Sequence, residues 1–213
     1  ISGGAGNDSL FGGEGSDTIS GGSGDDYIEA SGAWADTISG GSGIDTLSLQ
    51  RSDLTANQNI VFTPGGSFTL TDGTSVSGIE LLNLTTGSGD DQLTVTPLVA
   101  GSGQSFNLHA GTDHAVVDFS AFSDNVNVAQ GGNFARVYSQ WNGSSFNYDL
   151  YFYNTEALTI LGGSGSDSLT GDSGDDVLTG NDGNDSLHGG GGDDTISGGA
   201  GNDSLFGGEG SDT

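Results

Sequence analysis

The chain has 213 residues, enough for one or two ordinary domains, but 42 of them are Gly and only 31% are hydrophobic. With a net charge of −27, this composition is typical of a disordered chain unless bound cations neutralise the carboxylates and link folding to metal binding. Arg51 and Arg136 are the only basic residues apart from three His, which excludes ordinary binding to nucleic acid or to anionic membranes, and the absence of Cys excludes disulfides, thiolate metal sites and thiol nucleophiles.

Residues 3–48 repeat a nine-residue unit, Gly-Gly-x-Gly-x-Asp-x-apolar-x, with one irregular stretch. Residues 30–39 form a unit of ten, and when Asp36 keeps the Asp position, Trp34 stands where the pattern has Gly. We expect this Gly position to need a positive φ, which a bulky side chain resists. The sequence therefore predicts a bulge at this turn and a weakened or absent metal site.

Between Leu49 and Leu161 the strict period mostly stops, and the sequence is typical of ordinary β-structure. No window has a 3.6-residue apolar period, so helices are not expected. The candidate strands are rich in β-branched and aromatic residues and are separated by Gly, Asn, Asp and Ser. They are 60–63, 67–71, 79–84, 92–96, 105–108, 115–119, 126–129, 135–140, 147–153 and 158–161.

This middle region contains an internal duplication. GIDTLSLQRS at 43–52 matches GTDHAVVDFS at 111–120, and GIELLNLTTGSGDDQLT at 78–94 matches NTEALTILGGSGSDSLT at 154–170. We therefore expect two enlarged coils, 49–85 and 114–161, that carry extra strands on one common roll.

From Gly162 to the C-terminus the nonapeptide pattern returns for five full units and most of a sixth. Residues 196–213 repeat residues 1–18 without change, as ISGGAGNDSLFGGEGSDT. Two units make eighteen residues, so the simplest hypothesis is a longer protein built from tandem copies of a 195-residue module; a duplication added at one end is the alternative. The expected organisation is a nonapeptide roll at 1–48, enlarged β-rich coils at 49–161 with isolated repeat-like turns at 86–94 and 108–116, and a second nonapeptide roll at 162–213.

The repeat unit has the chemistry of a calcium site. Its first six residues must turn sharply, which Gly permits, and its last three form a short strand with the apolar residue facing inward. Two units close one coil, so turns two units apart stack on the same edge and surround the Asp carboxylate with backbone carbonyls. Calcium favours such cages of 6–8 oxygens, whereas transition metals prefer His or Cys and magnesium prefers strict octahedra.

Eleven turns keep both the Gly and the Asp in register, and a twelfth, at Asp113, lacks the paired Gly. The predicted calcium ligands are Asp8, Asp17, Asp26, Asp45, Asp91, Asp113, Asp167, Asp176, Asp185, Asp194, Asp203 and Asp212. In two units Gly is replaced at the second position, by Asp172 and by Asn181, and we expect those cages to be altered.

These repeats resemble the RTX (repeats-in-toxin) family of calcium-binding nonapeptide repeats, over about half of the chain. The resemblance implies an all-β, right-handed parallel β-roll, a solenoid with calcium ions along both edges and here with two enlarged β-coil insertions. It also implies export by type I secretion and folding in a calcium-rich exterior. Because the family includes toxins, proteases, lipases, adhesins and surface-layer proteins, the resemblance does not determine the function.

The sequence contains no catalytic signature of a metalloprotease or a serine hydrolase, and we expect no enzymatic activity and no catalytic residue. Glu80 and Glu156 occupy matching positions in the duplication, which favours a shared structural role, as a turn contact or an extra calcium ligand, over catalysis. The aromatic residues are candidates for the core, for an interface between modules or for a glycan platform: Trp34, Trp141, Phe146, Tyr148, Tyr151, Phe152 and Tyr153.

Three functional hypotheses remain open. The first is a calcium-stiffened module of a long secreted protein, such as an extracellular filament, matrix, stalk or surface-layer component, in contact with adjacent copies of itself. The second is an adhesin module that binds glycans or neighbouring cells, and the third is a secretion and folding domain attached to a hydrolase or toxin. All three place the chain outside the cell with calcium as its cofactor, and no apolar segment approaches the ~20 residues of a membrane span, so we expect no membrane insertion.

Overall fold

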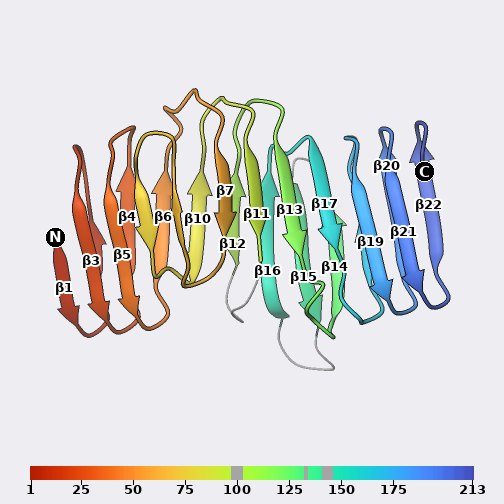
Figure 1. Cartoon of the computed structure of the whole chain (residues 1–213), viewed down its shortest axis with the longest axis horizontal. Helices are drawn as coiled ribbons and strands as arrows, with labels where there is room; N and C mark the ends of the chain where they lie inside the picture. The colour runs from red at the N-terminus through yellow and green to blue at the C-terminus, as the bar shows by residue number, and fades with distance from the viewer. Residues whose placement is uncertain (97–102, 132–133, 141–145) are drawn as a thin grey trace.

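The computed structural model describes residues 1–96, 103–131, 134–140 and 146–213. They form one elongated β-roll whose strands run across the long axis and whose termini lie at opposite ends (Figure 1). Every regular element of these residues is a β-strand, and no helix among them is long and apolar enough to cross a membrane. The expected all-β roll of mostly parallel strands is confirmed.

One wall of the roll is a single eleven-stranded sheet. It runs the whole length of the molecule, from the first repeat unit to the last. In spatial order its strands are β2 (Ser9–Phe11), β4 (Tyr27–Ser31), β6 (Thr46–Gln50), β10 (Leu81–Thr85), β12 (Gln104–Asn107), β16 (Phe146–Tyr153), β15 (Phe134–Gln140), β14 (Asn125–Gln130), β18 (Ser168–Thr170), β20 (Ser186–Gly191) and β22 (Ser204–Glu209).

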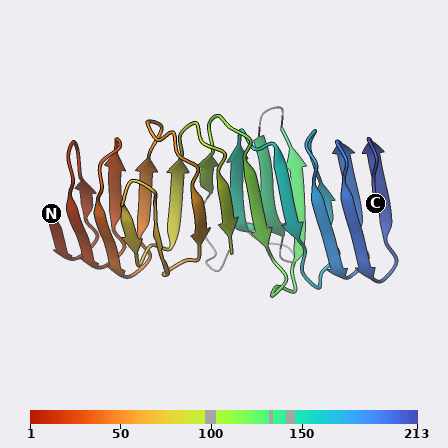
Figure 2. The same cartoon turned by 45° about the horizontal axis from the view of Figure 1, so that its top comes forward.

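The other wall is divided into two sheets. The five-stranded sheet has the order β1 (Ser2–Ala5), β3 (Thr18–Ser23), β5 (Thr37–Ser42), β9 (Ser75–Ser77) and β8 (Ser67–Thr69). The six-stranded sheet has the order β21 (Thr195–Ala200), β19 (Val177–Asp182), β17 (Ala157–Leu161), β13 (His114–Asp118), β11 (Gln92–Val95) and β7 (Asn59–Phe62). The boundary between these two sheets falls in the first enlarged coil. Figure 2 shows the strands following one another along the length of the roll.

Parallel pairing between successive coils sets the pitch. Ser2 pairs with Ser20 near one end and Ser186 pairs with Ser204 near the other, so one coil is two units long, as expected. Across the ten-residue unit, Ile19 pairs with Ile38, one residue further along. The extra residue is absorbed in the turn before β5, and Ile38 therefore keeps its place in the core.

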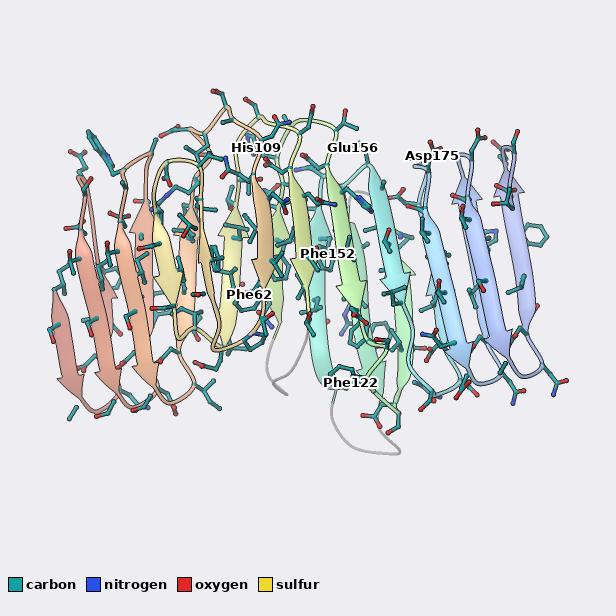
Figure 3. All side chains as sticks on the ribbon, viewed as in Figure 1. Phe62, His109, Phe122, Phe152, Glu156 and Asp175 are labelled. Carbon is teal, nitrogen blue, oxygen red and sulfur yellow. The ribbon has the colours of Figure 1, made fainter. Side chains whose placement is uncertain are left out.

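The core is thin in the repeats and thicker in the middle. Ile28 and Leu187 are typical of the repeats, where a strand contributes one or two small or apolar side chains that are almost completely buried. The middle adds buried aromatic rings, including Phe106 and Phe152, which stack with their centroids 5.2 Å apart. Phe62 is also buried, and Figure 3 labels it and Phe152 in the middle part of the roll.

The structure places a strand at each of the ten positions predicted in the middle region, within about two residues at each end. The prediction missed β9, whose only apolar residue is Val76. The extra strands of the enlarged coils are antiparallel: β8 pairs with β9, and β15 pairs with both β14 and β16. Trp141 and the side chains of Phe146 and Tyr148 lie outside the part of the chain that the structure describes.

Candidate metal centres

The turns that enter the strands form two edges, and every predicted ligand lies on one of them. The lower edge of Figure 1 precedes the strands of the eleven-stranded wall and carries Asp8, Asp26, Asp45, Asp167, Asp185 and Asp203. The upper edge precedes the strands of the divided wall and carries Asp17, Asp91, Asp113, Asp176, Asp194 and Asp212. Glu156 and the turn before β19, marked by Asp175, lie on this upper edge in Figure 3.

Hydrogen bonds connect these carboxylates into a ladder along each edge. The backbone N–H of Asp8 donates to Oδ1 of Asp26, and the N–H of Asp26 donates to Oδ1 of Asp45, both at 2.8 Å. The same contact recurs on the upper edge, where the N–H of Asp176 donates to Oδ1 of Asp194 at 2.9 Å. One oxygen of each aspartate in the ladder is therefore used to tie adjacent coils together.

The second oxygen of most of these aspartates has no such partner. Among the described residues, eight buried Oδ2 atoms accept no hydrogen bond, those of Asp8, Asp17, Asp26, Asp45, Asp91, Asp113, Asp185 and Asp194. A buried carboxylate oxygen without a hydrogen-bond partner destabilises the folded state by roughly several kcal/mol. A fold that repeats this feature therefore needs a cation next to these oxygens.

Backbone carbonyls converge on the same oxygens. A Cβ added to Gly3 would lie 2.6 Å from Oδ2 of Asp8 and 2.7 Å from the carbonyl oxygen of Gly21 in the next coil. Gly21, Gly180 and Gly189 face the same pair of groups, their own turn's Asp and a carbonyl of the neighbouring turn. Glycine is thus required there because a carboxylate and a carbonyl occupy the space of a side chain.

The turn conformation supplies these carbonyls. Gly22 and Gly24 have φ values of 118° and 116°, in the left-handed region that favours glycine. Two non-glycine residues take the second position of a unit with positive φ, His109 at 71° and Asn181 at 74°. Asn181 makes a contact that a glycine cannot make, because its Nδ2 donates to the carbonyl of Gly162 at 2.7 Å.

The raised pKa values of buried aspartates also indicate that the folded chain needs a cation at these turns. Burial raises the pKa of Asp113 to about 6, with further contributions from Asp91 and Glu156. Burial also raises the pKa of Asp185, with a further contribution from Asp203. A carboxylate whose pKa is raised on folding opposes folding once the pH exceeds its unfolded value, and a bound cation reverses this effect.

Two predicted ligands differ from the others. Oδ2 of Asp167 accepts the N–H of Gly163 at 2.9 Å, and Oδ2 of Asp176 accepts the N–H of Asp172 at 2.7 Å. These oxygens are satisfied within their own turns, so the eleven turns that share the sequence pattern are not equivalent. Asp113, whose turn lacks the paired Gly, has a free Oδ2 and resembles the regular turns.

Other residues continue the ladder where an Asp is absent, including the N–H groups of Val126 and Leu158, which donate to Oδ1 of Asp167 and of Asp176. Oε2 of Glu80 accepts the N–H of Asp45, and Oε2 of Glu156 accepts the N–H of Asp113, both at 2.8 Å, which confirms a shared structural contact for the two glutamates. The sequence analysis missed Thr74, whose Oγ1 accepts the N–H of Asp36 at 3.3 Å, and Gln58, whose N–H donates to Oδ1 of Asp91 at 2.7 Å. Neither follows a Gly-rich turn, so the repeat pattern gave no signal for them.

The donor set suits calcium. No group of three or more His, Asp or Glu side chains gathers at one point within the described residues, so each cage consists of one or two carboxylates and backbone carbonyls. Such all-oxygen, irregular cages are typical of Ca²⁺. When bound, the ion supplies positive charge and coordination for the oxygens that the protein leaves unpaired.

Comparison with known families agrees with this geometry. The family model of the RTX calcium-binding nonapeptide repeat matches the chain in four copies, at residues 1–32, 35–49, 159–187 and 179–213. The chain contains RTX calcium-binding nonapeptide repeats. RTX nonapeptide repeats bind calcium ions, and proteins that carry them are typically exported by type I secretion. No curated protein matches this RTX chain.

Proposed function

We propose that this RTX chain is a calcium-stiffened structural module of a long extracellular protein, in which copies of the module follow one another in a continuous roll. The role is mechanical, as in a filament, a stalk or a surface layer, and it involves no catalysis.

One observation carries this proposal: the same eighteen residues form the coil at both ends of the roll. At the N-terminal end this coil pairs with the coil that follows it, through β1 and β3. At the C-terminal end the identical coil pairs with the coil that precedes it, through β19 and β21. Both pairings keep the two-unit pitch, so a shared coil would join two modules without a change of register.

The strand order gives the proposal a length. β2 and β22 come from the repeated string and are the first and last of eleven strands, so ten strand spacings separate equivalent points. At about 4.8 Å each, one module would extend the roll by about 48 Å.

A two-copy protein, residues 1–195 followed by residues 1–213, tests this number. We expect small-angle X-ray scattering in calcium to show a rod about 48 Å longer than the single chain, and a flexible, expanded particle in chelator. As a control, three residues inserted between residues 195 and 196 would break the pitch and should make the joint flexible. Two independently tumbling bodies in calcium, without the insertion, would refute the continuous roll.

A second candidate function, glycan adhesion, is favoured by one surface. The outward faces of β15 and β16 carry Phe134, whose ring centroid lies 5.9 Å from that of Tyr151 and 5.6 Å from that of Tyr153. The amides of Asn154 and Asn107 are hydrogen-bonded to each other at 2.8 Å, beside the last residue of β16. Aromatic rings next to polar amides are the groups that sugars stack on and bond to.

A glycan array probed with the calcium-loaded chain tests this candidate. Binding that is lost in Tyr151→Ala and kept in Phe11→Ala, an exposed aromatic residue in the repeats, would support adhesion through this face. Absence of binding to any glycan would leave the mechanical role as the better explanation.

A further inference from the structure

Arg51 is a completely buried cation at the start of the first enlarged coil. Its exposed fraction is 0%, and arginine is almost never fully buried unless its charge is paired. It follows β6 directly and reaches the upper edge of the roll at the turn of Asp36, the turn whose sequence predicted a weakened or absent metal site.

Five oxygen atoms accept hydrogen bonds from this guanidinium, and they are of the kinds that bind calcium: two carboxylates, a hydroxyl and two backbone carbonyls. Nη2 donates to Oδ2 of Asp36 at 2.6 Å, to Oγ1 of Thr74 at 3.2 Å and to the carbonyl of Trp34 at 3.4 Å. Nε donates to Oδ2 of Asp72 at 3.2 Å, and Nη1 donates to the carbonyl of Gln50 at 3.1 Å.

The Asp36 turn otherwise behaves like its neighbours. Its Oδ1 accepts the N–H of Asp17 at 2.8 Å, so the ladder is intact. Its Oδ2, the atom that lacks a partner at Asp17 and Asp26, is here paired with Arg51. The turn therefore keeps the carboxylate and the ladder, and differs in the source of the positive charge.

We propose that the Arg51 guanidinium takes the place of a calcium ion at the Asp36 turn, so that this part of the roll carries its own cation and folds without metal. The oxygen atoms around the guanidinium form a cation site. Replacement of Arg51 by a small uncharged residue converts this site into a calcium site.

The adjacent part of the upper edge is also satisfied by protein groups alone. Asp72 accepts the N–H of Thr74 at 2.8 Å as well as bonding Arg51, which fixes its carboxylate. Oε1 of Gln58 accepts the N–H of Thr71 at 3.0 Å, and its Nε2 donates to Oγ1 of Thr71. Between the Asp36 turn and β7, side chains thus fill the positions that the repeats leave to a cation.

Hydrogen exchange of the complete chain, in calcium and in excess chelator, tests the proposal. The reporter amide is that of Ser75, which donates to the carbonyl of Asp36 at 2.8 Å. The comparison amide in the repeats is that of Thr46, which donates to the carbonyl of Asp26 at 2.8 Å, in a turn whose Asp26 has an unpaired Oδ2. In chelator we expect Ser75 to stay protected and Thr46 to lose protection. Equal loss of protection at both amides would overturn the proposal.

Arg51→Ala tests the cation directly, with Arg136→Ala as the matched control. Arg136 is the other arginine of the chain, and its ion pair with Asp149 lies on the outer face, 28% exposed. In chelator, Arg51→Ala should lower protection at Ser75 by at least about 100-fold, because a buried carboxylate loses its partner, while Arg136→Ala should not.

In calcium, Arg51→Ala should regain protection at Ser75 and bind one more calcium ion than the natural chain, measured by equilibrium dialysis. Loss of protection that calcium does not restore would show that Arg51 acts through packing alone. If Arg51→Ala does not fold in calcium, Arg51→Lys and Arg51→Gln decide the question in chelator. Protection kept by Lys and lost by Gln supports the proposal, and equal behaviour of the two overturns it.

Discussion

The repeats and the middle region of the roll are stabilised in different ways. In the repeats, residues 1–48 and 162–213, the strands bury little apolar surface, and most of the buried aspartates leave one oxygen unpaired. In the middle, aromatic rings such as Phe106 and Phe152 thicken the core, and Arg51 supplies a cation to the Asp36 turn, while Asp91 and Asp113 keep an unpaired Oδ2 as in the repeats. The difference teaches that where apolar burial is too small to offset chain entropy, this fold depends on a ligand for its stability.

The two halves of the duplication place the same Asp–Glu contact on opposite edges of the roll. The Asp45–Glu80 contact lies on the lower edge, whereas the equivalent Asp113–Glu156 contact lies on the upper edge. Because one coil has two equivalent turns, a copy displaced by an odd number of half-coils comes out on the opposite edge. The same local sequence therefore forms the same contact on either side.

The largest expected effect is that of removing calcium. At a calcium concentration 100 times the dissociation constant, each site contributes about 2.7 kcal/mol, so several sites together exceed the roughly 5–15 kcal/mol of a typical domain. We expect excess chelator to unfold the repeats, with a large loss of β-signal in far-UV circular dichroism, while the middle keeps part of its signal. An unchanged spectrum in chelator would refute the calcium dependence of the repeats.

A smaller effect should separate two kinds of aspartate within the repeats. Oδ2 of Asp185 has no partner, whereas Oδ2 of Asp176 accepts the N–H of Asp172 in its own turn. We expect Asp185→Asn to remove about one calcium ion, and up to about 2.7 kcal/mol of calcium-dependent stability, in isothermal titration calorimetry and thermal melts. Asp176→Asn should leave the calcium stoichiometry unchanged, and equal losses in both variants would contradict the distinction.

The sequence predicted the fold from its period, because Gly, Asp and one apolar residue in phase leave few alternatives to a coil of two units. It also predicted that the Asp36 turn would be irregular, since Trp34 stands at a Gly position. It did not predict that Arg51, fifteen residues further on, would supply the cation, because that contact depends on the course of the enlarged coil. The sequence also did not predict that Oδ2 of Asp176 would accept the N–H of Asp172 within the same turn.

Substitutions of Glu80 distinguish a ladder contact from a calcium ligand at the border between the two regions. Oε2 of Glu80 accepts the N–H of Asp45. Burial raises the pKa of the Asp45 carboxylate, and the negative charge of Glu80 contributes to this rise. Glu80→Ala leaves that N–H without an acceptor and should cost about 1–3 kcal/mol in urea unfolding.

Glu80→Gln keeps an acceptor oxygen and removes one negative charge next to Asp45, so its stability should fall by less than about 0.5 kcal/mol. Calcium binding separates the two roles, because a ladder contact needs only the oxygen, whereas a ligand needs the charge. We expect Glu80→Gln to bind calcium as the natural chain does, with Asp45→Asn as the matched loss of a true ligand. If Glu80→Gln weakens calcium binding as much as Asp45→Asn, then Glu80 is itself a calcium ligand, and the repeat chemistry extends into the middle region.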